Sequence, residues 1–163
     1  HLSIRRQRQM CIRDRYIGGG NTKSMLAVFK EWGLDKLLLK AYKDGKILAG
    51  VSAGAICWFD QGITDSWEDG LRVLDCMGIL KGVCCPHYDG EVDRKPSVEK
   101  FLKSNEIDAF FCIEDGASIQ YKNNKLILNF NDNYNYTKIH TLPCNSFFRW
   151  CFGWWWRNTI CLY

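Results

Sequence analysis

The sequence has 163 residues, of which 47% are hydrophobic and 25% charged, the composition of a globular protein with one core. Its net charge of +4 comes from the arginine-rich residues 1–15, so the rest of the chain is neutral and gives no sign of a nucleic-acid partner. No apolar run approaches the roughly 18 residues of a membrane-spanning helix, which excludes an integral membrane protein. Residues 1–15 also lack the apolar centre of a signal peptide, which predicts a cytoplasmic location.

The nine cysteines show no C-x-x-C spacing, which disfavours a zinc site. Five of them lie within apolar runs, where a free thiol behaves as a small hydrophobic side chain; these are Cys57, Cys76, Cys84, Cys85 and Cys112. The sequence therefore predicts reduced thiols, with no metal and no organic cofactor.

Residues 1–15 have neither a helical nor an alternating pattern, and we interpret them as a non-native head outside the folded domain. The pattern starts with Tyr16–Thr22, which predicts a strand end, a turn through three glycines and a helix capped by Asn21 or Thr22. A glycine run of this kind serves as a plain turn, an anion site or a donor of backbone N–H groups. A second helix is expected over Leu34–Lys43.

The next segment, Lys46–Val51, has the pattern of a buried strand and is followed by a turn of small residues around Ser52. A helix is expected from Ala53 to about Phe59. A serine on a sharp strand-to-helix turn is exposed at the carboxyl edge of a sheet, beside the free N–H groups of the helix. This nucleophile elbow is the setting in which a hydroxyl acts as a nucleophile.

Gln61–Ser66 is predicted to be a polar loop, and the apolar stripe of Leu71–Leu80 to approach the sheet. Gly82–Asp89 then has the pattern of a short buried strand that ends at His87. The other two histidines of the chain lie in the head and near the tail. His87 is therefore the best candidate for a general base.

A helix is expected from Pro96 to about Asn105, followed by a strand buried on both faces over Ile107–Ile113. This strand ends at Glu114, a carboxylate at the same kind of strand end as Ser52 and His87. A β-hairpin is expected after it, with strands at 117–121 and 125–130 joined by two asparagines.

The alternation of strands and helices predicts an α/β fold with a mostly parallel sheet covered by helices on both faces. Ser52, His87 and Glu114 then gather at the carboxyl edge of the sheet. An imidazole can take the proton of a serine hydroxyl, and a carboxylate fixes the imidazole tautomer. The three residues thus form a complete catalytic relay.

Four segments resemble the peptidase E (aspartyl dipeptidase) family of serine peptidases, relatives of cyanophycinase. They are Tyr16–Thr22, Gly50–Ala55, Cys85–Asp89 and Glu114–Gly116, within residues 16–136. The resemblance implies a fold similar to class I glutamine amidotransferases, with flavodoxin-like layering and serine in place of cysteine at the elbow. It also implies a dipeptidase for short peptides with an N-terminal aspartate. Ser52 is then the nucleophile, His87 the general base and Glu114 the carboxylate that orients it.

Further roles follow from the same resemblance. The N–H of Ala53 and one from Gly19 or Gly20 would form the oxyanion hole. Asp65 is the best match to an auxiliary aspartate of the family, and Arg94 is a candidate cation for an acidic substrate side chain.

The chain departs from the family at both ends. Family members carry about two more strands before the glycine segment, so N-terminal strands are expected to be missing. Residues 137–163 have an atypical, tryptophan-rich pattern, which we interpret as a frameshifted tail. Residues 16–136 are therefore predicted to be a single α/β domain. Because a sheet without its first strands exposes an apolar edge, we expect poor solubility.

Two alternatives remain open. The first is an esterase of the α/β-hydrolase type, in which Asp65 or Asp75 would be the acid of the triad. The second is a non-catalytic remnant that keeps the elbow as a binding module.

Overall fold

The computed structural model describes residues 14–104, 110–129 and 159–162. The first part of the chain contains β1 (Arg15–Ile17), α2 (Thr22–Glu31), α3 (Leu34–Lys43), β2 (Leu48–Val51), α4 (Ala53–Ile56) and β3 (Phe59–Trp67). The remainder contains β4 (Gly70–Asp75), β5 (Leu80–Cys85), α5 (Arg94–Ser104), β6 (Phe110–Cys112), β7 (Ser118–Lys122), β8 (Lys125–Asn129) and β9 (Thr159–Leu162).

The described strands form two sheets, with the strand orders β1-β2-β9-β7-β8 and β4-β3-β5-β6. Four of their pairings are parallel (β1–β2, β3–β5, β5–β6, β7–β9) and three are antiparallel (β2–β9, β3–β4, β7–β8). The predicted α/β class with mostly parallel pairing is therefore confirmed, with the strands divided between two sheets.

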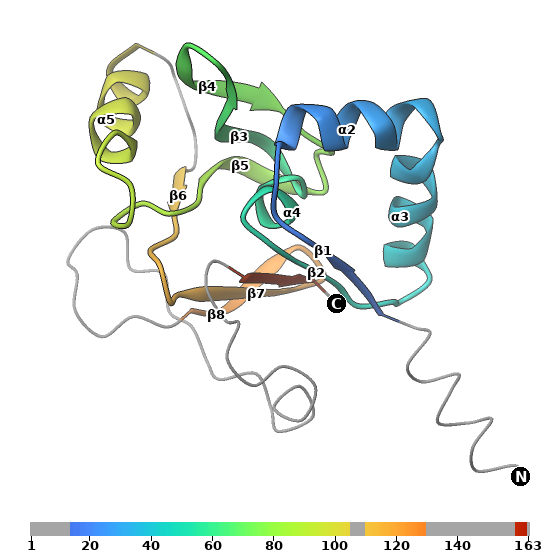
Figure 1. Cartoon of the computed structure of the whole chain (residues 1–163). Coiled ribbons are helices and arrows are strands. Elements are labelled where there is room, and N and C mark those ends of the chain that lie inside the picture. The colour runs from blue at the N-terminus through green and yellow to red at the C-terminus, as the bar shows by residue number, and fades with distance from the viewer. Residues whose placement is uncertain (1–13, 105–109, 130–158, 163) are drawn as a thin grey trace, which may run out of the picture.

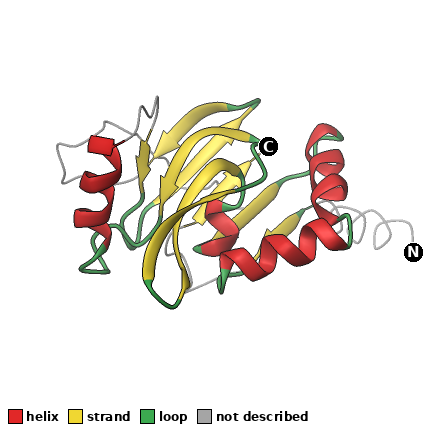
Figure 2. Cartoon of the chain, turned by 90° about the horizontal axis from the view of Figure 1, so that it is seen from above, coloured by secondary structure: helices red, strands yellow, loops and turns green. Residues whose placement is uncertain are grey.

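The core lies between these sheets and around α4, the short helix at the centre of Figure 1. Trp58 and Phe59 are fully buried there, and the Phe59 ring lies 5.3 Å from Phe111 and 6.2 Å from Tyr121. A smaller cluster, in which Val98 of α5 packs against the four-stranded sheet, completes the buried interior. Figure 2 shows α5 at one end of the molecule and the α2–α3 pair at the other.

Several predicted elements are confirmed. The helix over Leu34–Lys43 has the bounds that the sequence predicted, and Asn21 caps α2 by accepting the N–H of Ser24 through its side chain. The predicted hairpin is formed by β7 and β8. Its turn residues Asn123 and Asn124 have φ angles of 51° and 59°, as the favoured two-residue hairpin turn requires.

Other predictions for the middle of the chain were wrong. The segment predicted to be a polar loop, Gln61–Ser66, is part of β3, and the helix expected up to Phe59 is the single turn α4. β3 can carry polar residues because they bond to one another: the Gln61 amide donates to Asp75 on β4 at 2.8 Å. The strand β9 lies in the tail, where the sequence predicted no element.

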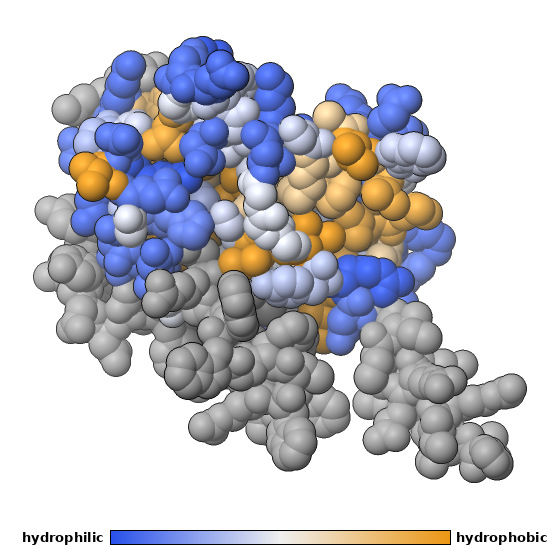
Figure 3. Space-filling view, viewed as in Figure 1, coloured by the Kyte–Doolittle hydropathy of each residue, from blue (hydrophilic) through white to orange (hydrophobic). Residues whose placement is uncertain are grey.

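The boundaries predicted at residues 15 and 136 stay predictions, because most of both flanking segments lies outside the described residues. Within the described residues, β1 is an edge strand with β2 as its neighbour. Apolar side chains also gather over α2 and α3 (Figure 3), where Val28, Trp32 and Leu37 are at least half exposed. The expected poor solubility stays a prediction. No helix of the described part is long and apolar enough to cross a membrane.

Candidate active site

Ser52 lies in the sharp turn that joins β2 to α4. Its backbone has φ 53° and ψ −115°, a conformation that costs energy for a residue with a side chain. A Cβ atom on Gly50 would overlap the carbonyl of Gly54, and one on Gly54 would overlap the carbonyl of Ile17. The glycines therefore allow β2, α4 and β1 to meet in the predicted strand–turn–helix.

We expect Gly54→Ala to destabilise the protein by about 3 kcal/mol or more, because the new methyl group meets backbone atoms that cannot move aside. The effect opposes the usual gain of replacing glycine by alanine in a helix. The matched control is Gly18→Ala, where the added Cβ has open space. Urea unfolding followed by circular dichroism measures both, and equal stability of the two variants would contradict the prediction.

The glycine loop before α2 runs directly beside Ser52. A Cβ on Gly19 would lie 3.3 Å from the Ser52 Cβ, and Gly20 has φ +137°, which favours glycine. Ala53 is the first residue of α4 and is buried. Because the first N–H groups of a helix lack partners within it, the Ala53 N–H has no acceptor inside α4.

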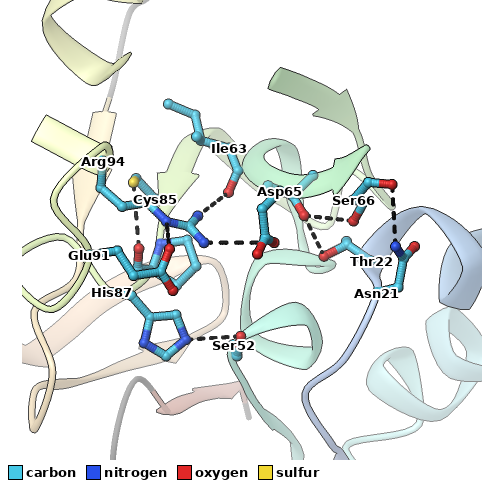
Figure 4. Close-up of polar contacts among 12 residues, drawn as sticks. Asn21, Thr22, Ser52, Ile63, Asp65, Ser66, Cys85, His87, Glu91 and Arg94 are labelled. Carbon is cyan, nitrogen blue, oxygen red and sulfur yellow. Dashed lines mark hydrogen bonds and ion pairs between the residues drawn. The ribbon is translucent and has the colours of Figure 1, made fainter. Parts of the chain in front are cut away.

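A cluster of hydroxyl groups, of which the sequence singled out only Thr22 as a candidate helix cap, joins this loop to β3 (Figure 4). The hydroxyls of Thr22 and Thr64 are 3.1 Å apart, and that of Thr64 lies 2.7 Å from Ser66. The Asn21 amide donates to the Ser66 carbonyl at 3.2 Å, and the Lys23 N–H donates to the Ser66 hydroxyl at 3.2 Å. These bonds hold the glycine loop in place from the side of β3.

His87 follows β5 and reaches Ser52 from the other sheet. Its Nε2 lies 3.0 Å from the Ser52 Oγ (Figure 4), and its Nδ1 lies 2.8 Å from Oδ1 of Asp115. The imidazole and the Asp115 carboxylate are about one quarter and one third exposed, so the hydroxyl, imidazole and carboxylate form one hydrogen-bonded chain open to a substrate.

The carboxylate of this chain is Asp115, whereas the sequence analysis assigned the contact to Glu114. The backbone explains the difference of one residue. Pairing with β5 continues to Ile113, and Glu114 then opens a tight turn in which its carbonyl accepts the N–H of Ala117 at 3.0 Å. Asp115 occupies the corner of that turn and so faces His87. Burial and the neighbouring Asp89 charge raise the pKa of the Glu114 carboxyl.

Arg94 lies at the start of α5 with its side chain 3% exposed. Its Nε donates to Glu91 at 2.7 Å and its Nη1 to the carbonyl of Ile63 at 2.9 Å. Its Nη2 lies 3.8 Å from Oδ1 of Asp65, whose side chain is 68% exposed. Two predicted residues thus face each other, Arg94 from α5 and Asp65 from β3 (Figure 4).

Thiols are present near this site but are not poised to react. Cys85 ends β5, and burial raises its pKa to about 12, as it does for Cys112 on β6. A thiol with such a pKa stays protonated at neutral pH and is a poor nucleophile. Within the described part of the chain, no group of three or more histidine, cysteine or acidic residues is arranged to hold a metal ion.

Comparison with known proteins identifies the family. The model of peptidase family S51 matches residues 9–129. An uncharacterized peptidase of Bacillus subtilis, YgaJ, is 46% identical over 111 residues, which cover 68% of this chain and 48% of the relative. An uncharacterized peptidase of Listeria innocua, Lin0382, is 31% identical over 80 residues, or 45% of this chain and 38% of the relative.

The chain thus spans about half the length, or less, of the curated relatives it matches. No solved structure matches the chain significantly. The family match covers every segment on which the resemblance to peptidase E rests, and that prediction is confirmed. The chain belongs to peptidase family S51.

Proposed function

We propose that this chain carries the catalytic site of a serine peptidase that hydrolyses short peptides, with a preference for an N-terminal aspartate. The observation that carries the proposal is the contact chain from the Ser52 hydroxyl through His87 to Asp115, with distances of 3.0 and 2.8 Å. Family membership and the similarity to two proteins named as peptidases support the same activity.

In the proposed reaction, Nε2 of His87 takes the proton of Ser52 while Oγ attacks the peptide carbonyl. The N–H groups of Ala53 and of Gly19 or Gly20 stabilise the negative oxygen of the tetrahedral intermediate. The imidazolium, held by Asp115, then gives its proton to the leaving amine. Water, activated by the same imidazole, releases the acyl group and restores the serine. No metal or organic cofactor takes part in this proposal.

The preference for aspartate rests on the resemblance and on the position of Arg94. Its Nη2 already faces the carboxylate of an aspartate, Asp65, without a hydrogen bond at 3.8 Å. A substrate carboxylate that replaced Asp65 would form a closer, charge-assisted pair with the same nitrogen. We also propose a cytoplasmic location, because the described cysteines are packed as free thiols.

Removing Asp65 tests this idea without disturbing the core, since its side chain is largely exposed. We expect Asp65→Ala to lower KM for Asp-Leu about threefold to tenfold and to leave Leu-Leu unchanged, because a competitor for Arg94 is gone. Glu68→Ala, which removes an exposed charge from the turn after β3, is the control. A fall in kcat for both peptides would instead assign Asp65 an auxiliary catalytic role.

The activity itself is tested by hydrolysis of Asp-Leu, Glu-Leu and Leu-Leu by the wild type and by Ser52→Ala, with circular dichroism of both proteins. We expect the wild type to hydrolyse Asp-Leu in preference to the other two dipeptides, and Ser52→Ala to hydrolyse none of them. Faster turnover of p-nitrophenyl acetate than of any dipeptide would favour an esterase. A folded wild type with no turnover of any of these substrates would contradict the proposal.

A further inference from the structure

We propose that Asp89 is a positioning residue, which holds the turn of Asp115 in the place where its carboxylate meets His87. Asp89 lies two residues after His87, in the loop between β5 and α5. Its Oδ1 accepts the main-chain N–H of Asp115 at 2.7 Å. The inference deepens the proposed function, since it concerns how the carboxylate of the relay is kept in register.

The loop that carries His87 grips the Asp115 turn at several points. The Tyr88 N–H donates to the carbonyl of Ile113 at 3.0 Å, directly before the turn. A Cβ on Gly90 would overlap Oδ2 of Asp115 and lie 2.9 Å from its Cγ. The Tyr88 bond thus holds the residue before the turn, whereas Asp89 and Gly90 both lie against Asp115 itself. We call residues 88–90 the clasp.

The clasp is needed because Asp115 lies beyond the end of the strand ladder. The last backbone bond from β6 to β5 is that of the Ile113 N–H to Cys85, at 2.9 Å. Two residues later a side chain, Asp89, supplies the acceptor for the Asp115 N–H. A short bond to a carboxylate is stronger than one between neutral groups, so a single side chain can fix the corner of the turn.

The position of Asp89 costs electrostatic free energy, because its carboxylate lies near that of Glu114. Its charge helps to raise the pKa of Glu114, after the larger effect of burial. The two carboxylates of Asp89 and Glu114 repel each other, and the hydrogen bond from the Asp115 N–H to Asp89 offsets this repulsion. Asparagine at position 89 would keep an acceptor oxygen and remove the charge, which separates the bond from the electrostatic effect.

The experiment compares Asp89→Ala, Asp89→Asn and Gly90→Ala with the wild type, and uses Glu99→Ala on the exposed face of α5 as the charge control. The first readout is kcat and KM for Asp-Leu. The second is the downfield proton resonance of a hydrogen-bonded imidazole Nδ1–H of His87, which needs no substrate. Thermal melting reports on folding.

We expect Asp89→Ala to lower kcat ten- to a hundredfold, to change KM less than twofold and to weaken the downfield resonance. Asp89→Asn should restore both quantities to within about threefold. Gly90→Ala should reproduce the loss, because its methyl group displaces the Asp115 carboxylate. Glu99→Ala should behave as the wild type.

Three results would contradict the proposed role of Asp89. One is an unchanged resonance and kcat in Asp89→Ala. Another is an equal loss in Asp89→Asn, which would make the charge the active property. The third is a change confined to KM, which would make Asp89 a substrate contact. If the wild type cleaves no peptide, the resonance still decides for or against the clasp, so its failure and that of the proposed function are distinguishable.

Discussion

Ser52→Ala is expected to lower kcat for Asp-Leu on the order of 10⁶-fold, to the limit of detection. The hydroxyl is the group that forms the covalent bond to the substrate, and removal of the nucleophile from such a relay leaves only the oxyanion hole and binding. Hydrolysis is measured by the release of free leucine, with circular dichroism to show that the variant is folded.

The control for this variant is Ser97→Ala, which removes a hydroxyl from α5 and should leave kcat unchanged. Because alanine has the same Cβ atom as serine, the strain of the φ angle of 53° is unchanged, and the replacement is not expected to abolish folding. Activity of Ser52→Ala within tenfold of the wild type would show that the reaction proceeds without this hydroxyl.

Asp115→Asn is expected to lower kcat on the order of 10⁴-fold, with KM changed only slightly. The asparagine amide can present its N–H to Nδ1 of His87, which favours the tautomer that cannot accept the Ser52 proton. The adjacent Glu114→Gln is the matched control, because it makes the same chemical change one residue away. We expect it to stay within about threefold of the wild type.

Comparison of the Asp115→Asn and Glu114→Gln variants shows which carboxylate orients His87. A large loss in Glu114→Gln with an active Asp115→Asn would restore the assignment made from the sequence. Equal losses in both variants would show that the field of the two carboxylates, rather than one bond at 2.8 Å, supports the imidazole.

The serine and the histidine could be predicted from the sequence because each has a local signature. Small residues around Ser52 favour a sharp turn, and His87 ends an apolar run that is typical of a short buried strand. Their contact at 3.0 Å joins the ends of β2 and β5, which belong to different sheets, so the single predicted sheet did not account for it.

The carboxylate could not be assigned in the same way, since Glu114 and Asp115 are adjacent and both are acidic. Which of them faces His87 depends on where β6 stops and on the turn closed by Ala117. Neither is visible in hydrophobic periodicity. The acidic side chain immediately before Gly116, at the corner of a turn, was the signal available.

The error over β3 has a different origin. Its polar residues are satisfied inside the fold, with the Thr64 hydroxyl buried between Thr22 and Ser66, so a strand with few apolar residues passes for a loop. The strand β9 pairs with β2 and β7, which are far from it in the sequence. Such long-range pairing cannot be recognised from the residue pattern of a short segment.

The most direct test of the account is covalent labelling with a fluorophosphonate, followed by peptide mapping by mass spectrometry. We expect one added phosphonyl group, located on Ser52, with labelling lost in Ser52→Ala and slowed strongly in Asp115→Asn but not in Glu114→Gln. A folded protein whose Ser52 is not labelled, or which is labelled at another serine, would contradict it.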